Sequence, residues 1–336
     1  MKTRVIIVCS VLVAAISCDK EKIQSPYYWS DLFLNMYANE LVIGDLEPGP
    51  APLAHKRTVL LITGVTIKAK WFDPIVARLR RDGFEPVVYE PPALLSGSLF
   101  QAARDLADVV AKVRADSGQD KIDILAECTG GVIARYYVHT LGGDKLVNRL
   151  VTFVSPHHGI DRALMAAKLA GWPALYDLSP GSAFLLAVNA KPTPKSVKLT
   201  SIYTCADEYI TPYQTSIVEG AKNIGLCDET VGHFQTFYDP KIYLIMHKAL
   251  TEGDTPASGQ NQSIAPSTVN PNGSASNTGN AGTPAEDVSG DGVPNVGCSA
   301  AGMSSSSTSA TATGLWILLA TLALVLLRRR KAAPLL

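Results

Sequence analysis

The chain has 336 residues, and its 30 Lys plus Arg balance its 30 Asp plus Glu, so the formal net charge at pH 7 is zero. This balance excludes a strongly charged surface, and we therefore expect neither nucleic acid nor another highly charged partner. Hydrophobic residues make up 47% of the sequence. They include an apolar run at each end, which frame a central stretch long enough for one folded domain.

The first 17 residues have the parts of a secretory signal peptide. A basic start is followed by an apolar run from Val5 to Ile16, which is too short to span a bilayer, and by a small-residue end. Cleavage after Ser17 leaves Cys18 as the first residue, which resembles a lipoprotein signal except that Ala15 stands where Leu is usual. Lipidation of Cys18 and simple secretion both stay open.

The other end carries an apolar segment over about 312–327, followed by the basic cluster Arg328–Lys331. The segment is just long enough to cross a membrane, and the basic cluster predicts that everything before it lies outside the cytoplasm. Residues 298–336 as a whole resemble a Myxo-CTERM sorting tail. That resemblance implies processing near Cys298 and surface anchoring. A plain membrane anchor also gives an exported protein.

Three of the six cysteines lie in the central stretch, namely Cys128, Cys205 and Cys227. In an exported protein we expect Cys205 and Cys227 to form a disulfide while Cys128 stays free. Two buried thiols are the alternative, because a sequence does not give the Cα separation that a disulfide requires.

Strand and helix patterns alternate over residues 57–252. Strands of the continuously apolar or β-branched kind are predicted over 58–62, 86–89, 122–126, 149–154, 198–203 and near 221–226. Helices are predicted over about 71–82, from 99 to 117, after 128, and over about 240–250. This alternation predicts an α/β fold with a mostly parallel sheet, right-handed crossovers and helices on both faces.

Three segments flank or interrupt this domain. Residues 18–56 form an N-terminal arm whose aromatic run, Tyr27–Leu34, is either a lid over a lipid site or a cover for the core. Residues 160–196 are irregular and helical, and they lie over the carboxyl ends of the strands, where such folds place ligands. Residues 253–297 are rich in Ser, Thr, Asn, Gly and Pro, which predicts a disordered linker.

The run Ile122–Arg135 has the strand–turn–helix pattern of a nucleophile elbow. Within it, Ala126–Gly130 reads A-E-C-T-G where G-x-S-x-G is usual. Cys128 is therefore the candidate nucleophile, at a helix N-terminus where the dipole favours a thiolate. The alternative is an inert buried thiol.

Cys128, Asp207 and His233 follow predicted strands in the order nucleophile, acid, base that α/β-hydrolases use. His233 would take the thiol proton and pass a proton to the leaving group, and Asp207 would hold the imidazole in the required tautomer. The backbone N–H groups of Val65 and Thr129 are the expected oxyanion donors.

Other titratable residues leave alternatives open. His233 could be structural, Asp207 could cap a turn, and Glu208 could be the acid instead. His157 and His158 look like a metal pair, but adjacent residues rarely point at one ion, so we expect them to pack in a loop. We expect no metal and no other cofactor.

The core resembles small secreted triacylglycerol lipases and esterases of the α/β-hydrolase superfamily. The matching segments run in family order from about residue 57 to 250: Val59–Gly64, the elbow with Gly131–Tyr137, Val154–Gly159, Pro180–Leu185, Tyr203–Pro212 and Gly232–Phe234. The resemblance implies the α/β-hydrolase fold, an acyl-enzyme mechanism and an acyl ester or lipid substrate, with a membrane contact supplied by the C-terminal anchor.

The sequence departs from that family at four positions, with Thr63 and Glu127 in place of His, Ala126 in place of Gly and Cys128 in place of Ser. Cys is a workable nucleophile on this fold, as the superfamily resemblance implies, since dienelactone hydrolases belong to the same superfamily. Glu127 places a carboxylate beside the thiol, which would raise the thiol pKa. We expect an exported ester hydrolase, and the alternatives are a silent relative that binds hydrophobic ligands and an acyltransferase or thioesterase.

Overall fold

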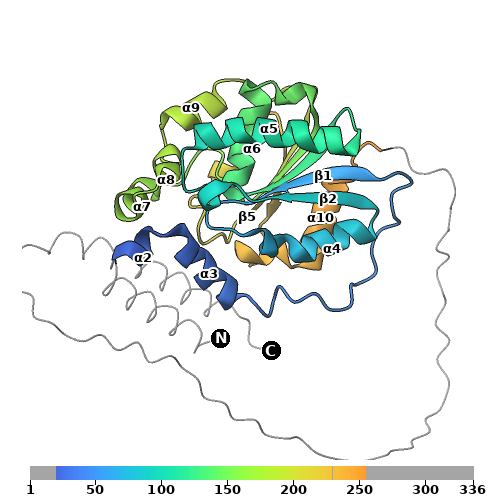
Figure 1. Ribbon diagram of the computed structural model, residues 1–336, viewed down its shortest axis with the longest axis horizontal. Coiled ribbons are helices and arrows are strands. Elements are labelled where there is room, and N and C mark those ends of the chain that lie inside the picture. The colour runs from blue at the N-terminus through green and yellow to red at the C-terminus, as the bar shows by residue number, and fades with distance from the viewer. Residues whose placement is uncertain (1–19, 229, 255–336) are drawn as a thin grey trace, which may run out of the picture. The chain divides into compact units, whose positions relative to one another are not determined.

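The structure is a computed structural model that describes residues 20–228 and 230–254 (Figure 1). The predicted signal peptide, Cys18, nearly all of the linker, and the sorting tail with its apolar segment lie outside the described residues. Within the described ranges, no helix is both long enough and apolar enough to span a membrane.

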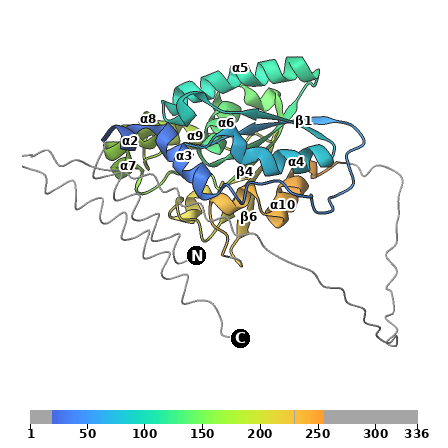
Figure 2. The same cartoon turned by 60° about the horizontal axis from the view of Figure 1, so that its bottom comes forward.

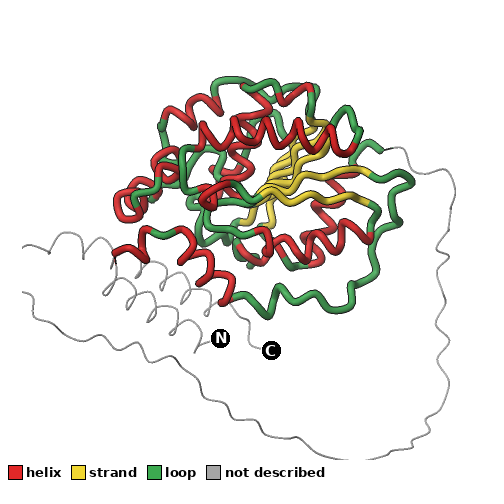
Figure 3. The backbone as a smooth tube through the Cα atoms, viewed as in Figure 1, coloured by secondary structure: helices red, strands yellow, loops and turns green. Residues whose placement is uncertain are grey.

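A parallel sheet forms the centre of the described domain (Figure 3). Its strands are β1 (Arg57–Ile62), β2 (Phe84–Tyr89), β3 (Ile122–Glu127), β4 (Val147–Phe153), β5 (Lys198–Thr204) and β6 (Lys222–Leu226). They lie in the order β2-β1-β3-β4-β5-β6, and each neighbouring pair is parallel. The α/β class and the mostly parallel sheet predicted from the sequence are confirmed.

Helices cover both faces of the sheet (Figures 1 and 2). One face carries α5 (Leu99–Ser117) and α6 (Cys128–Thr140), and the other carries α4 (Asp73–Arg81) and α10 (Pro240–Thr251). Strand β1 shows why both are needed. Leu60 and Ile62 pack into the α5–α6 side, while Val59 and Leu61 pack into the α4–α10 side. Alternate residues of a strand face opposite ways, so a continuously apolar strand requires cover on both faces.

The long helix α5 ends as its sequence predicts. Gly118 adopts the left-handed conformation with φ 67°, and its N–H donates to the carbonyl oxygen of Arg114. Glycine is the usual residue at this position because it has no Cβ to clash there. The predicted helix over 71–82 differs, since it starts as the 3-10 turn η1 (Ala69–Phe72) and becomes α4 at Asp73, where Pro74 fits the first turn.

The arm and the insertion are mostly helical. The arm contains α2 (Lys20–Gln24) and α3 (Pro26–Met36), and the insertion contains α7 (Ala163–Ala170), α8 (Pro173–Asp177) and α9 (Ala183–Asn189). Short 3-10 turns complete the described elements: η2 (Pro92–Leu95), η3 (Gly143–Lys145), η4 (Tyr213–Ser216) and η5 (Phe234–Phe237). The indole N–H of Trp172 donates to the carbonyl oxygen of Gln24 at 2.7 Å, so the arm and the insertion are joined directly.

A disulfide joins Cys205 to Cys227, with their Cα atoms 4.9 Å apart. Each cysteine directly follows the end of one of the paired strands β5 and β6. Cys128 is the free cysteine among the described residues.

The two adjacent histidines have separate partners. His157 is fully buried, and its Nε2 lies 3.0 Å from Thr152 Oγ1, whereas Nε2 of His158 lies 3.1 Å from the carbonyl oxygen of Ile217. They pack against the loop and do not face one ion. Burial, with the nearby Arg135 cation, lowers the pKa of His157 well below its ordinary value. The same two causes lower the pKa of His139 to about 4.

We expect these histidines to make the domain acid-sensitive. Their folded-state pKa values lie below the unfolded value of about 6.5, so the unfolded chain binds more protons as the pH falls. Stability is then fully present above pH ~6.5 and is lost as the pH falls from there toward the folded-state values. Melting temperatures at pH ~7.5 and ~5 measure the loss.

The variant His139→Gln removes one of these groups and should make the acid-induced drop in melting temperature smaller. His55→Gln, at an exposed position, is the matched control and should leave the drop unchanged. A melting temperature that does not fall between pH ~7.5 and ~5 would contradict the prediction.

Candidate active site

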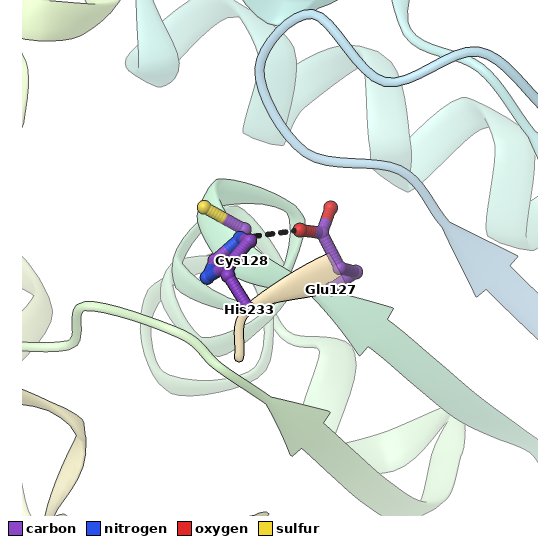
Figure 4. Close-up of side chains that lie close together, drawn as sticks. All are labelled: Glu127, Cys128 and His233. Carbon is purple, nitrogen blue, oxygen red and sulfur yellow. Dashed lines mark hydrogen bonds and ion pairs between the residues drawn. The ribbon is translucent and has the colours of Figure 1, made fainter. Parts of the chain in front are cut away.

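Cys128 lies in the turn from β3 to α6, at the carboxyl edge of the sheet (Figure 4). Its φ is 47°, in the left-handed region that residues with a side chain rarely adopt. Such a strained residue persists only where its surroundings fix it. Gly130 allows this, because a Cβ there would lie 2.7 Å from the carbonyl oxygen of Thr63. The first turn of α6 can therefore pack directly against the end of β1 and hold the Cys128 side chain outward.

His233 lies on the loop between β6 and η5, and it is 4% exposed. Its Nδ1 lies 2.8 Å from Asp207 Oδ2, and we assign the ring N–H as the donor. The loop position is fixed as well, because the backbone N–H of His233 donates to Glu208 Oε2 at 2.9 Å. Asp207 and Glu208 thus hold the same residue, one through its ring and one through its backbone.

Asp207 performs two tasks that the sequence left as alternatives. Its Oδ1 accepts hydrogen bonds from the backbone N–H groups of Tyr209 and Ile210, both at 2.8 Å, and so it caps the turn after β5. Its Oδ2 is then left to bind His233. The turn therefore fixes the direction in which the carboxylate approaches the imidazole.

Glu127 makes the contact that sequence reasoning missed. It is fully buried, its Oε2 accepts a hydrogen bond from the backbone N–H of Gly64 at 2.8 Å, and its Oε1 lies 3.1 Å from His233 Nε2 (Figure 4). Gly64 is required here, since a Cβ at that position would lie 2.5 Å from Glu127 Oε2. The sequence contained part of the signal for this contact, because Glu127 stands directly before the candidate nucleophile, where another residue type is usual.

The imidazole of His233 therefore lies between two carboxylates. Burial alone would lower the pKa of His233, but the adjacent Asp207 carboxylate and the hydrogen bonds to Asp207, Cys128 and Glu127 raise it well above its ordinary value. Burial also raises the pKa of the Cys128 thiol, and the Glu127 carboxylate raises it further. The resting thiol is consequently protonated at neutral pH.

The two predicted oxyanion donors come from different parts of the chain, α6 and the loop after β1. Thr129 is in the first turn of α6, where backbone N–H groups have no partner within the helix, and its Oγ1 is 3.7 Å from Cys128 Sγ. Val65 follows β1, and its backbone N–H makes no hydrogen bond with the residues that the structure describes. The neighbouring N–H of Gly64 is instead occupied by Glu127.

Helix α3 packs beside the site. Phe33 and Tyr37 contact Phe234, with ring centroids 5.3 and 5.0 Å apart, and Trp71 stacks on the same ring at 4.7 Å. Phe234 is the residue after His233, so the arm packs directly against the loop that carries His233. These contacts are those of a segment that covers the core.

Comparison with known proteins supplies the family context. The sequence profile of the palmitoyl protein thioesterase family matches residues 92–217, a span that includes Cys128 and Asp207. Lipase B of Pseudozyma antarctica is 25% identical over 172 residues, which cover 49% of this chain and 49% of that lipase. The chain thus spans about half the length of the curated relative that it matches.

Two solved structures are similar in fold. Aspergillus fumigatus lipase B has a TM-score of 0.52 at 18% identity, and the match covers 60% of this chain and 55% of that one. Bacillus licheniformis lipase BlEst2 in its propeptide form has a TM-score of 0.50 at 16% identity, with 61% and 52% covered.

The chain has the α/β-hydrolase fold. Its sequence is similar to those of lipases and palmitoyl protein thioesterases, and identities this low in the solved structures speak for the fold alone. The residues that do chemistry must be argued from the site itself.

We expect Glu127→Gln to make Cys128 more reactive. The amide has no charge, so it removes one of the causes that raise the thiol pKa, and one pKa unit is a tenfold change in thiolate at a pH below the pKa. Alkylation of Cys128 by iodoacetamide in the presence of a chelator should be ~10-fold faster in this variant than in the wild type, and mass spectrometry measures its rate.

Glu208→Gln is the matched control, because it makes the same charge change on the backbone side of His233. Its alkylation rate should stay near that of the wild type. An unchanged or slower rate in Glu127→Gln would show that the carboxylate does not restrain the thiol.

Proposed function

We propose that the chain hydrolyses carboxylic esters through an acyl-enzyme formed on Cys128. The observation that carries this proposal is the Asp207–His233 hydrogen bond of 2.8 Å, placed beside a half-buried thiol on a strained elbow. A nucleophile, a base and a group that orients the base are the parts that acyl transfer requires. The family context of lipases agrees with this choice.

The chemistry would proceed in two halves. Cys128 Sγ loses its proton to His233 and attacks the carbonyl carbon, and the negative charge on the carbonyl oxygen is stabilised by the N–H groups of Thr129 and Val65. The bond to the leaving group breaks, and His233 returns the proton to the leaving oxygen. In the second half, His233 takes a proton from water and the hydroxide attacks the thioester carbon. The bond to Cys128 Sγ then breaks, His233 returns the proton to this sulfur, and the carboxylic acid leaves.

Glu127 adds a condition to the first step. His233 Nε2 and Glu127 Oε1 lie 3.1 Å apart and share a proton, so this proton must stay on Glu127, whose pKa is raised by burial, before Nε2 can turn to Cys128 Sγ and accept the thiol proton. Once the thiol proton has moved, the Asp207 carboxylate stabilises the imidazolium that results. The acyl-enzyme would therefore form slowly while His233 Nε2 and Glu127 remain hydrogen-bonded.

A thioester substrate is the second candidate, and the matched palmitoyl protein thioesterase profile favours it. A thiol nucleophile exchanges with a thioester at little cost, because one thioester replaces another. A thiolate is also a good leaving group without a proton, whereas an alkoxide is not. The need for His233 as an acid is correspondingly smaller.

The proposed place of action is outside the cytoplasm, with attachment to the membrane or cell surface. The Cys205–Cys227 disulfide supports this, because such bonds persist in oxidising compartments. The signal-like start and the sorting-like tail in the sequence point the same way. An acyl ester or lipid near the membrane would then be within reach of the site.

Removal of the thiol tests the proposed nucleophile. We expect Cys128→Ala to lower the hydrolysis of a short-chain p-nitrophenyl ester by at least ~10³-fold and to abolish the acyl adduct seen by mass spectrometry. Activity is measured as release of p-nitrophenol in the presence of a chelator. His158→Gln serves as the control and should retain activity, because the ring of His158 contacts the carbonyl oxygen of Ile217 in the surrounding loop.

The opposing outcomes are distinct. Turnover that survives Cys128→Ala would place the chemistry elsewhere. A wild-type chain that neither turns over nor forms an adduct would point to the alternative of a silent relative that binds hydrophobic ligands. Activity that appears only in Cys128→Ser would identify a lipase site that has lost its hydroxyl.

A second test compares a thioester with an oxygen ester, which differ in their leaving group. For one acyl chain, we expect kcat/KM for the thioester to exceed that for the oxygen ester by ~10-fold or more, because the thiolate leaves without protonation. In Cys128→Ser the ratio should shrink, since a serine gains nothing from thioester exchange. A wild-type preference for the oxygen ester would contradict the thioester reading.

A further inference from the structure

Three kinds of metal-ligating atom meet at the elbow. Glu127 offers a carboxylate oxygen from the end of β3, Cys128 a sulfur from the start of α6, and His233 an imidazole nitrogen (Figure 4). These atoms all lie within 4.8 Å of one another. A tetrahedral zinc ion holds its ligands roughly 3.3 to 3.8 Å apart. The three atoms would therefore have to approach one another by about 1 Å to share one ion.

We propose that Glu127, Cys128 and His233 bind a divalent cation that prefers sulfur and nitrogen ligands, of the zinc class. Thiolate and imidazole select zinc and similar transition metals over magnesium and calcium, which take oxygen ligands. The proposal concerns the cation site itself and does not depend on the proposed hydrolysis.

The elbow explains how two adjacent residues can share an ion. Neighbouring side chains usually diverge, so the sequence alone does not predict a metal at this position. Glu127 has extended backbone angles, φ −98° and ψ 141°, whereas Cys128 has φ 47°. This abrupt change of direction leaves the carboxylate and the sulfur on the same side, both near His233 Nε2.

Two of the three ligands are already oriented by a second layer. Asp207 holds His233 through Nδ1, which leaves Nε2 directed at the site, and the backbone N–H of Gly64 holds the other oxygen of Glu127. Histidines that bind metals are generally held this way by a carboxylate on their second nitrogen. These two ligands therefore need little new ordering when an ion binds.

Charge also fits a dication. A carboxylate and a thiolate supply two negative charges, which cancel those of the ion in a place where Glu127 is fully buried and His233 nearly so. Binding displaces the thiol proton and the proton between His233 Nε2 and Glu127 Oε1, and both are released to solvent. No oxidant or reductant is involved.

A bound ion has a direct consequence for the thiol. Three ligands come from the described part of the chain, which would leave the fourth position of a tetrahedral ion for water. The ion would occupy Cys128 Sγ and His233 Nε2 together. The metal-bound form is therefore closed to acyl transfer through Cys128, and the chelated form is open.

The test uses the full chain, freed of metal with a chelator and then titrated with zinc alone by calorimetry. We expect one zinc ion per chain with a Kd on the order of 1 µM or lower. Cobalt(II) used as a spectroscopic probe should show the absorption of a thiolate–cobalt bond. Cys128→Ser should lose this band and weaken zinc binding by ~100-fold, and Asp207→Asn should weaken it by ~10- to 100-fold.

Cys298→Ser is the matched control, because it removes a thiol outside the described residues and should change neither the affinity nor the band. Circular dichroism of each variant shows that it is folded. Absence of stoichiometric zinc in the wild type, or an affinity and a band that survive Cys128→Ser, would overturn the proposal.

The proposed cation site and the proposed hydrolysis can be contradicted independently of each other. Zinc binding without ester or thioester turnover in the chelated chain would leave the cation site standing alone. Turnover without zinc binding would remove the cation site only. If both hold, zinc should inhibit the wild type, and the chelator should restore its activity.

Discussion

A buried carboxylate sets the geometry of this site. Glu127 has no exposed surface, and an ionised carboxylate in such a place must be paired and hydrogen-bonded to be tolerated. Its two oxygens meet this need with the N–H of Gly64 on the loop after β1 and with the ring of His233. One side chain thus connects the loop after β1, the turn at Cys128 and the loop that carries His233. A change in any of these three parts alters how the other two are held.

The sheet makes this convergence possible. Parallel strands end at one edge, so the loops after β1, β3, β5 and β6 emerge at the same edge of the sheet. Residues as far apart in the chain as Gly64 and His233 become neighbours without any long loop between them. The helices on the two faces keep the strands fixed, and the remaining freedom lies in the loop ends, where the chemistry is carried.

The sequence predicted the parts of the fold that depend on local patterns. Continuous apolar runs identified the strands, and Gly118 marked the end of α5. The elbow was also predictable, because a strand, a polar pair and two glycines follow one another directly. The contact between Glu127 and His233 was not, since it joins residues 106 positions apart and depends on side-chain directions that no local pattern encodes. Asp207 shows the same limit, because a turn cap and a partner for His233 look alike until the loops are placed.

The disulfide has a consequence for the two loops that carry Asp207 and His233. Cys205 stands two residues before Asp207, and Cys227 stands six residues before His233. One covalent bond therefore links the starts of both loops. The spacing between the Asp207 carboxylate and the His233 imidazole is that of the chain with this disulfide formed. In a reducing environment the loops would keep their strands but lose their common tether. The precision of the site is in this way linked to the chemistry of the compartment in which the chain folds.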